Sequence, residues 1–422
     1  MPRRRVVITG MGAVSSIGTG LAAIESALRE GRSGIRRVPE WGEMGIESQV
    51  AGVPEAEPDC PLLTRRVEKN STSVARMALF AAHEALRGAG LDPLGLRGQR
   101  LAVLIGSGSA STLQNFLSCR DLERTGTTRR VTPYTVPRVM GSTAAANVSV
   151  ALGTTGESWS VSSACSTGAH AIGLGALMIR WGRYDRILAG AAEELDWTRV
   201  GAFDAMRALS RGYNDRPEQA SRPFDVRRDG FVISGGAGVV VLEELEAARR
   251  RGAPILAEVA GYGANSDGHD MVLPDTRGAV NVMREALADA GIAPEEVGYV
   301  NAHGTSTPHG DPSEAAAMGE VFGRRQPWLS STKSITGHAI GAAGALEVIY
   351  TVLMMRGGFL APSRNLDEID PSCAHLRFVR EPDNDIAVTV AMSNSFGFGG
   401  TNASLVLRLV EPAGQPPRSA AS

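Results

Sequence analysis

The sequence has little lysine, little cysteine, almost no net charge and no long apolar run. The net charge is −2 over 422 residues, whereas a nucleic-acid-binding protein normally carries a basic excess or a basic stripe. No uninterrupted apolar stretch approaches the roughly 18 residues that cross a membrane. The basic start at 1–5 precedes too short an apolar run for a signal peptide. We therefore expect a protein that binds neither nucleic acid nor membranes.

The four cysteines, at positions 60, 119, 165 and 373, are scattered and include no CxxC pair. This spacing argues against a disulfide framework or a zinc ribbon, and it fits a reducing cytoplasm. Only two of the 43 basic residues are lysines, Lys69 and Lys333. A coding bias towards arginine is the simplest cause, but a remaining lysine is slightly favoured where the broad head of arginine would not fit. This draws attention to Lys333, whereas Lys69 is better interpreted as a surface residue.

Length and periodicity predict a layered α/β protein built from two domains or two fused halves. Short β-rich runs alternate with longer helical ones. Strands are expected at 5–10, 101–105, 158–161, 186–188, 238–242, 255–261, 297–301, 388–392 and 404–409. Helices are expected at 21–30, 73–89, 142–152, 167–181, 277–290, 312–322 and 341–356. Residues 107–138 hold few aliphatic side chains, so we expect an excursion over a surface or a partner.

Two distant segments of the chain resemble each other. Residues 162–173 (SSACSTGAHAIG) and 330–341 (SSTKSITGHAIG) align without a gap at an offset of 168 residues, with seven of twelve positions identical. At the fourth position one copy has Cys165 and the other has Lys333. The pair predicts one supersecondary unit that is used twice, with different chemistry at the same structural point.

A weaker similarity extends this inference to the whole chain. Residues 6–13 (VVITGMGA) resemble residues 257–264 (AEVAGYGA), which favours an internal duplication with a seam near residue 250. We expect a first half over 1–250 that carries the cysteine, and a second half over 251–410 that carries two histidines and the lysine. The small-residue and proline tail at 411–422 is expected to be disordered.

Cys165 is the first candidate for catalysis. It follows a strand-like run and directly precedes a helical pattern, which places it at a helix start. Unpaired backbone N–H groups and the helix dipole at such a position stabilise a thiolate, so we expect a lowered pKa, and the same N–H groups can hold an oxyanion. A free cysteine is more often a small buried hydrophobe, and only its possible partners favour the catalytic interpretation.

Two histidines and two glutamates are the possible partners of Cys165. His303 lies where a strand gives way to a polar loop, and His338 follows Lys333 by five residues in the turn before a helix. Together with a cysteine at a helix start, they form a plausible Cys-His-His set. Glu314 and Glu347 each lie early in a candidate helix, and either carboxylate could hold Lys333 as a buried pair.

Glycine-rich segments suggest one functional loop and one ordinary turn. The run NSFGFGGTN at 394–402 alternates glycines with Phe396 and Phe398, so its backbone can approach a ligand while an aromatic ring moves as a lid. A simple hairpin turn would give the same pattern. Gly10-Met11-Gly12 lacks the third glycine of a dinucleotide-binding turn, and we interpret it as a tight turn. A metal held by His303, His309 and Asp311 is less favoured than histidines that act as hydrogen-bond donors.

Four motifs, taken together, resemble those of the β-ketoacyl-ACP synthases over nearly the whole chain, from Val6 to about Val410. They are SSACSTGAH, NAHGTSTPHGD, SSTKSITGHAIGAAGALE and NSFGFGGTN. The segments GAAEELDWTRVGAFDAMRALSRGYND and SRPFDVRRDGFVISGGAG look most like the bacterial type I elongating enzymes. The resemblance implies a thiolase fold, in which two duplicated α/β halves form a five-layered αβαβα sandwich, and a dimeric enzyme.

The resemblance also implies a role for each motif residue. Cys165 would accept the acyl group, while His303 and His338 would drive decarboxylation of malonyl-ACP and stabilise the enolate. Lys333, held by Glu314, would organise the site. The remaining implied positions are Phe398 and Gly399 at the oxyanion hole and gate, Thr305 and Thr307 on the phosphopantetheine arm, and Phe203 and Phe396 along the substrate path. No metal and no separate cofactor are implied, because the substrates arrive on acyl carrier protein.

Four functions remain to be distinguished at this point. The first is a β-ketoacyl-ACP synthase of fatty-acid elongation in the cytoplasm, acting as a homodimer. The second is the ketosynthase subunit of a type II polyketide system, paired with a chain-length-factor-like subunit. A non-catalytic partner subunit would lack the cysteine, which is present here. A biosynthetic thiolase would need a second cysteine near the 394–402 loop, and that loop has none.

Overall fold

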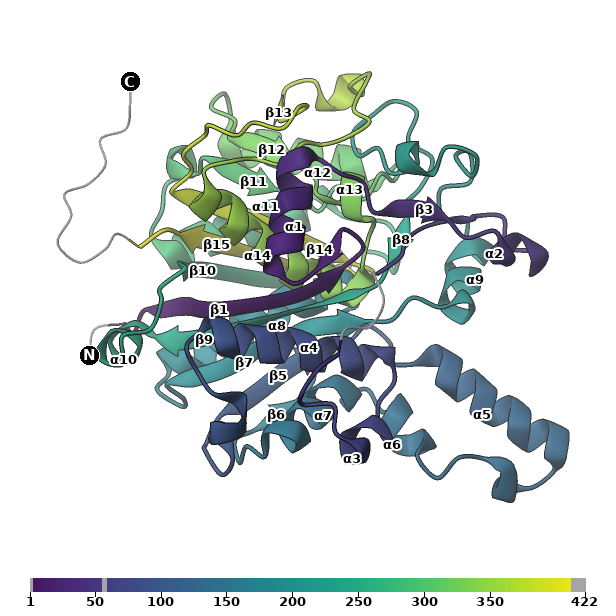
Figure 1. Cartoon of the computed structure of the whole chain (residues 1–422). Helices are drawn as coiled ribbons and strands as arrows, with labels where there is room; N and C mark the ends of the chain where they lie inside the picture. The colour runs from purple at the N-terminus through teal and green to yellow at the C-terminus, as the bar shows by residue number, and fades with distance from the viewer. Residues whose placement is uncertain (1–2, 55–58, 411–422) are drawn as a thin grey trace.

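One large mixed sheet runs through the centre of the molecule (Figure 1). The computed structural model describes residues 3–54 and 59–410, so the predicted disorder of 411–422 lies outside the described residues. The strand order is β13 (Arg377–Phe378), β12 (Trp328–Ser330), β11 (Tyr299–Asn301), β14 (Val390–Gly397), β15 (Thr401–Arg408), β10 (Ala257–Ser266), β1 (Val6–Ser15), β9 (Gly236–Glu244), β7 (Arg186–Glu193), β5 (Ala102–Gly106) and β6 (Ser158–Trp159), with β2 (Gly18–Thr19) paired to β1.

The two sides of this sheet repeat one pairing pattern. Starting from β1, the strands β9, β7, β5 and β6 follow with two antiparallel and then two parallel pairings. Starting from β10, the strands β15, β14, β11 and β12 follow in the same way. The two sides meet where β1 pairs with β10, with Val7 opposite Glu258. The predicted internal duplication is therefore confirmed.

Helices form the other layers around this sheet (Figure 1). On the outer face of the first side lie α4 (Ser73–Gly88) and α7 (Thr143–Leu152), and on that of the second side lies α11 (Thr276–Ala290) with α12 (Gly310–Phe322) beside it. Between the two sides, α8 (Thr167–Arg180) packs against α14 (Ala343–Gly357), and α1 (Leu21–Glu30) packs on α14. The segment Ile340–Gly357 is long and apolar enough to cross a membrane, but 89% of it is buried inside the molecule, as a core helix would be. This arrangement confirms the expected αβαβα layering.

Glycines in β1 and β10 bring the outer helices against the sheet. A Cβ added at Gly10 would lie 2.0 Å from the Ala85 carbonyl oxygen of α4, and one at Gly12 would lie 2.1 Å from that of Ala81. The same contact recurs in the second half. A Cβ at Gly261 would lie 2.1 Å from the carbonyl oxygen of Ala286 in α11, and one at Gly263 would lie 2.2 Å from that of Val282. The predicted tight turn at Gly10-Met11-Gly12 is thus wrong, because these residues belong to a strand that a helix approaches closely.

The structure matches the residues of the two halves at a different offset from the 168 residues of the sequence similarity. Each central helix follows one 3₁₀ turn, η3 (Ala164–Ser166) before α8 and η6 (Ile340–Ala342) before α14. Each turn opens on a non-glycine residue with positive φ, 49° at Ala164 and 45° at Ile340. Cys165 therefore corresponds to Gly341. Lys333 lies earlier, in the one-turn helix α13 (Lys333–Thr336), which has no counterpart between β6 and α8.

The contacts between the two central helices support the same register. A Cβ at Gly168 would lie 2.5 Å from the Ala345 backbone nitrogen, and one at Gly344 would lie 2.9 Å from that of Ala169. These are reciprocal contacts only if Gly168 corresponds to Gly344 and Ala169 to Ala345. The predicted equivalence of Cys165 and Lys333 is therefore wrong.

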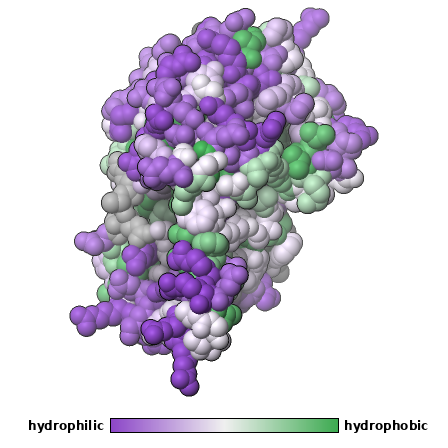
Figure 2. Space-filling model, turned by 90° about the vertical axis from the view of Figure 1, so that its right-hand side faces the viewer, coloured by the Kyte–Doolittle hydropathy of each residue, from purple (hydrophilic) through white to green (hydrophobic). Residues whose placement is uncertain are grey.

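Several smaller elements lie near the edge of the molecule, and most were not predicted. The excursion at 107–138 contains α5 (Thr112–Thr125) and α6 (Thr135–Val139), which project from the body in Figure 1, and Ser118 is the one buried residue of α5. The face that carries α5 shows a pale to green apolar band between hydrophilic regions (Figure 2). The remaining elements are α2 (Glu40–Glu43), α3 (Arg65–Glu68), α9 (Trp197–Ala205), α10 (Leu245–Arg250), and a small sheet of β3 (Ile35–Arg37), β4 (Val50–Gly52) and β8 (Ile233–Ser234).

Candidate active site

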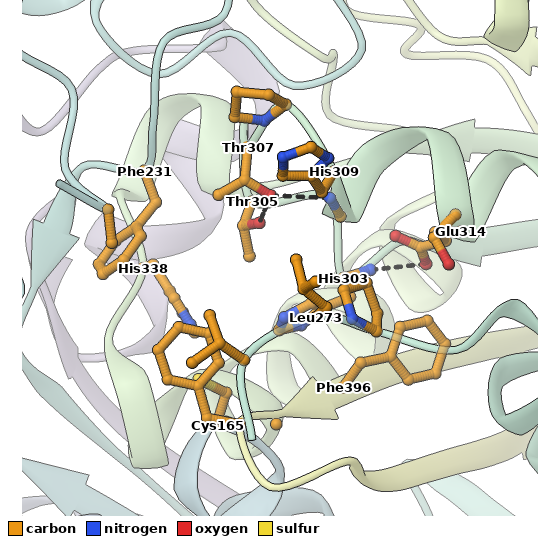
Figure 3. A pocket seen from close by; sticks show the side chains of 18 of the residues that line it. Cys165, Phe231, Leu273, His303, Thr305, Thr307, His309, Glu314, His338 and Phe396 are labelled. Atoms are coloured by element: carbon orange, nitrogen blue, oxygen red, sulfur yellow. Dashed lines mark hydrogen bonds between the residues drawn. The ribbon is translucent and has the colours of Figure 1, made fainter. Parts of the chain in front are cut away.

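A cavity of about 350 Å³ opens between the two halves of the fold. Nine of the residues predicted from the sequence line it, namely Cys165, Phe203, His303, Thr305, Thr307, Glu314, His338, Phe396 and Phe398. Figure 3 shows Cys165, His303 and His338 grouped at one end of this cavity, with Thr305 and Thr307 farther along it. Gly399 and Lys333 do not line the cavity, although Phe398 and Gly400 on either side of Gly399 do.

Cys165 lies on a strained turn at the start of a central helix. Ala164, just before it, adopts φ 49°, a left-handed conformation that non-glycine residues rarely hold outside functional sites. The thiol is 9% exposed, and burial raises its pKa to about 12, although Lys333 and the backbone N–H of Phe398 act in the opposite direction. The predicted lowering of this pKa is therefore wrong, because removal from water outweighs the groups that favour the thiolate.

The rings of the two histidines pack edge to face in the cavity wall. Their ring centroids lie 5.4 Å apart with the ring planes at 87°. The pKa of each imidazole is lowered well below its usual value by burial, and the charge of Lys333 lowers it further. His303 Nδ1 and both ring nitrogens of His338 have no hydrogen-bond partner within the described part of the chain. Both rings are therefore neutral near pH 7 and can present a hydrogen bond to a substrate.

Backbone contacts hold both histidines in place. His338 N donates to the carbonyl of Val232 at 2.7 Å, and its own carbonyl accepts from Ser234 N at 2.9 Å, which docks it against β8. His303 N donates to a carboxylate oxygen of Glu314 at 2.9 Å, the bond drawn in Figure 3. These bonds hold the backbone of each histidine and do not use the ring nitrogens.

Lys333 pairs with Glu347, and the predicted pairing of Lys333 with Glu314 is wrong. Lys333 Nζ donates to Glu347 Oε1, and both side chains are 2% exposed. Burial raises the pKa of Glu347 to about 7 against the pull of Lys333. Glu314 instead accepts from the backbone N–H groups of His303 and Gly304. Glu347 lies one turn inside α14, and this ion pair joins α14 to the short helix α13.

The glycine-rich loop is the tip of the hairpin between β14 and β15. Its backbone N–H at Phe398 points to the Cys165 sulfur, and the Phe398 ring lies 6.4 Å from the ring of Phe203 on α9. Gly399 adopts φ 82°, a conformation that glycine reaches without strain. Phe396 lies 5.7 Å from the His303 ring. The segment is thus a hairpin turn, and the same turn carries the two aromatic rings that the lid interpretation requires.

Other groups near the cavity complete this description. Thr305 and Thr307 form a hydroxyl pair with their oxygens 3.1 Å apart (Figure 3). Phe231, which sequence reasoning missed, packs 5.5 Å from the His338 ring; nothing in its local pattern distinguishes it from an ordinary core residue. No group of His, Cys, Asp or Glu suited to a metal occurs among residues 3–54 and 59–410. His170 lies outside the cavity and pairs with the Ser163 hydroxyl at 2.7 Å.

Comparison with known proteins gives matches over almost the entire chain. Residues 3–248 match the model of the β-ketoacyl synthase N-terminal domain, and residues 256–367 match that of the C-terminal domain. The chain is 45% identical over 406 residues to 3-oxoacyl-[acyl-carrier-protein] synthase 1 of Escherichia coli, and 44% identical over 405 residues to that of Haemophilus influenzae. Each alignment covers 96% of this chain and 99% of the relative.

Solved structures give the same result. A β-ketoacyl synthase from Burkholderia phymatum matches with a TM-score of 0.91 and 39% identity. The ishigamide ketosynthase/chain length factor matches with a TM-score of 0.89 and 32% identity. A type II PKS acyl-carrier protein in complex with its ketosynthase matches with a TM-score of 0.88 and 31% identity. Each match covers 97% of this chain and 100% of the other.

Proposed function

The chain belongs to the β-ketoacyl synthase family and has its thiolase-type fold, and on that premise we propose that it condenses an acyl group with malonyl-ACP in fatty-acid elongation. The observation that supports this most directly is the meeting of one buried thiol with two neutral imidazoles in a single cavity, where three of the four ring nitrogens have no hydrogen-bond partner among the described residues. We assign the thiol to a first domain over 1–250 and the histidines and Lys333 to a second over 251–410.

The first step is transfer of the acyl group to Cys165. The thiol is protonated at rest, so its proton leaves as sulfur attacks the thioester carbonyl of acyl-ACP, and the released phosphopantetheine sulfur takes up a proton. The negative charge on the carbonyl oxygen falls between the backbone N–H of Cys165 and that of Phe398, which serve as an oxyanion hole. The product is an acyl thioester on Cys165.

The second step uses His303 and His338. Cleavage of the bond to the malonyl carboxyl group releases CO2 and leaves the electron pair as an enolate on the thioester oxygen. Two fixed imidazole donors in a buried pocket stabilise that oxygen more than water would, because their dipoles need no reorganisation. The enolate carbon then attacks the acyl group on Cys165, and departure of the cysteine sulfur gives β-ketoacyl-ACP.

The remaining predicted residues support these steps in our proposal. Burial keeps both imidazoles neutral, and the charge of Lys333, which is paired with Glu347, lowers their pKa further. Glu314 fixes the loop that carries His303. Thr305 and Thr307 bind the phosphopantetheine arm, while Phe203, Phe396, Phe398 and Gly399 line or gate the path of the acyl chain. Acyl carrier protein delivers both substrates in the cytoplasm, so no separate cofactor takes part, and the enzyme works as a dimer.

The proposed division of roles is tested by two variants assayed with acyl-ACP and malonyl-ACP. Cys165→Ala should form no β-ketoacyl-ACP. His303→Ala should lose decarboxylation of malonyl-ACP while Cys165 is still acylated, which mass spectrometry of the intact protein detects. Product formation by Cys165→Ala would contradict the nucleophile assignment, and loss of both steps in His303→Ala would contradict the separation of roles.

A second candidate is the ketosynthase subunit of a type II polyketide system. The likeness to the ishigamide ketosynthase/chain length factor favours it specifically. It differs from the first candidate in its partner, which would be a related chain that lacks the cysteine. Identification of the subunit that copurifies from the native source separates the two.

A further inference from the structure

Glu193, at the end of β7, is a buried carboxylate that the proposed mechanism does not use. It is 0% exposed. One of its oxygens, Oε2, accepts from two backbone N–H groups, that of Gly108 at 2.7 Å and that of Gly341 at 3.0 Å. The other, Oε1, accepts from the Ser107 hydroxyl at 3.0 Å and lies 2.8 Å from Arg199 Nη1. Two converging backbone N–H groups on one oxygen resemble an oxyanion hole that is already occupied.

The duplication shows what one of these two N–H groups, that of Gly341, corresponds to. Gly341 is the counterpart of Cys165, since each is the second residue of the 3₁₀ turn before a central helix. A Cβ added at Gly341 would lie 2.6 Å from Glu193 Oε2. The carboxylate therefore stands where the side chain of a second nucleophile would begin. In the second half of the fold, an internal anion takes the place of a reacting group.

In each half, the turn before the central helix is contacted by the end of a strand from the other half. Glu193 pairs with Gly236 at the end of the β7–β9 ladder, as Gly397 pairs with Thr401 at the end of the β14–β15 ladder. Gly397 leads into Phe398, whose N–H serves Cys165. The turn before α8 thus faces the end of β14 in the second half, which supplies an N–H donor. The turn before α14 faces the end of β7 in the first half, which supplies a carboxylate acceptor.

The turn that Glu193 holds forms part of the wall of the active-site cavity. Ile340 lines the cavity with Cys165 and His338 and adopts φ 45°, a strained conformation for a β-branched residue that persists only where the surrounding structure imposes it. The turn η6 also packs against η3, which carries Cys165. Release of Gly341 N–H would let Ile340 relax towards negative φ and shift the wall beside the nucleophile.

We propose that Glu193 is a positioning residue, which binds the Gly341 N–H, the counterpart of the Cys165 N–H, and so fixes the Ile340–Gly341 turn against Cys165. The inference rests on the proposed function for its catalytic consequence, although the contact itself does not. His338 and His303 are held by other bonds, to β8 and to Glu314. Loss of the Glu193 contact should therefore slow acylation of Cys165 more than it slows decarboxylation.

Two variants perturb the same contact by different means. Glu193→Gln replaces one of the two acceptor oxygens by an amide donor, and Gly341→Ala pushes the carboxylate and the Gly108 backbone away without a change of charge. Each should slow single-turnover acylation of Cys165 by about tenfold or more, because small displacements of reacting groups carry costs of this order. Each should also speed hydrogen exchange in the peptide that contains residues 340–342. Malonyl-ACP decarboxylation should fall by a smaller factor.

Two controls separate positioning from fold stability. Arg199→Met removes the ion pair, together with the bonds from Arg199 to the Glu194 and Ala110 carbonyls, and keeps the contacts of Glu193 with the N–H groups of Gly108 and Gly341. It should lower the melting temperature while acylation per folded molecule stays near the wild-type rate. Gly141→Ala, at a position with no atom within 4 Å of an added Cβ, controls for the glycine substitution. Wild-type acylation in folded Glu193→Gln and Gly341→Ala, or equal losses in Arg199→Met, would overturn the inference. If the wild-type protein condensed nothing, the proposed function would fail, while hydrogen exchange would still test the Glu193 contact.

Discussion

His338 and His170 differ in what their ring nitrogens can do. The ring nitrogens of His338 face the cavity without a partner within the described residues, whereas His170 Nδ1 is engaged by the Ser163 hydroxyl and its ring packs edge-on against Tyr262, with centroids 6.3 Å apart. We expect His338→Gln to lose condensation and His170→Gln to retain most of it, because only His338 can stabilise the enolate. Steady-state condensation with acyl-ACP and malonyl-ACP measures both, and an inactive, folded His170→Gln would contradict this assignment.

Glu347 and Glu314 should differ sharply when each is replaced. Glu347→Gln leaves Lys333 buried without a counter-charge, which typically costs 3–5 kcal/mol, as an order of magnitude. Glu314→Gln instead places an amide donor against the N–H groups of His303 and Gly304, so it should mainly reduce decarboxylation. Denaturant unfolding and the decarboxylation rate distinguish the two. The double variant Lys333→Met, Glu347→Met should regain stability without activity, and an active double variant would show that Lys333 is dispensable.

At the residue scale, the sequence predicted which side chains meet but not how they titrate or pair. Cys165, His303 and His338 stood out by their motifs and their positions at element ends. The sign of the Cys165 pKa shift depends on how completely the surrounding chain excludes water, which no local pattern contains. The partner of Lys333 depends on the fold of α13 against α14. Glu193 could have been noticed as an acidic residue at the end of a buried strand, and nothing in the sequence indicated the Gly341 contact.

At the element scale, close approach of helix to strand sets a strict size limit at four glycines. A Cβ at Gly12 or Gly263 would lie 2.1 or 2.2 Å from a helix carbonyl oxygen, so the helix or the strand would have to move. Gly12→Ala and Gly263→Ala should each destabilise the protein by about 1–3 kcal/mol or more, the usual cost of overpacking. Gly141→Ala should change stability little. Denaturant unfolding tests all three, and tolerance of alanine at Gly12 would contradict the close approach seen here.

The long periodic elements were predicted well because their burial pattern is local. Helix α1 occurs at Leu21–Glu30 as predicted, and α8 and α11 differ from their predicted bounds by one residue. The helix α5 was missed because it buries almost none of its side chains, so it lacks the apolar stripe by which a helix is recognised. The strands β3, β4 and β8 were missed because two or three residues carry no periodicity. They matter all the same, since β8 docks His338.

At the scale of the whole molecule, the duplication was predictable and its register was not. The weak similarity between β1 and β10 marks true counterparts, with glycines under α4 and α11 in both halves. The stronger similarity at an offset of 168 residues joins segments that play different parts, because α13 is inserted before the second central helix. Sequence identity over twelve residues was thus a poorer guide than the shared helix contact and the shared backbone strain at Ala164 and Ile340.

One chain carries every side chain that the proposed condensation needs. Cys165, His303, His338 and Lys333 all come from one chain, so the atoms needed for acylation, decarboxylation and carbon–carbon bond formation are present without a second kind of subunit. We expect the purified chain, expressed alone, to be a homodimer in light scattering and to convert acyl-ACP and malonyl-ACP to β-ketoacyl-ACP. Activity that appears only after addition of a related chain without the cysteine would instead assign it to the polyketide class. Because Cys165→Ala gives the background in both assays, the result depends on the partner and not on the chemistry of the site.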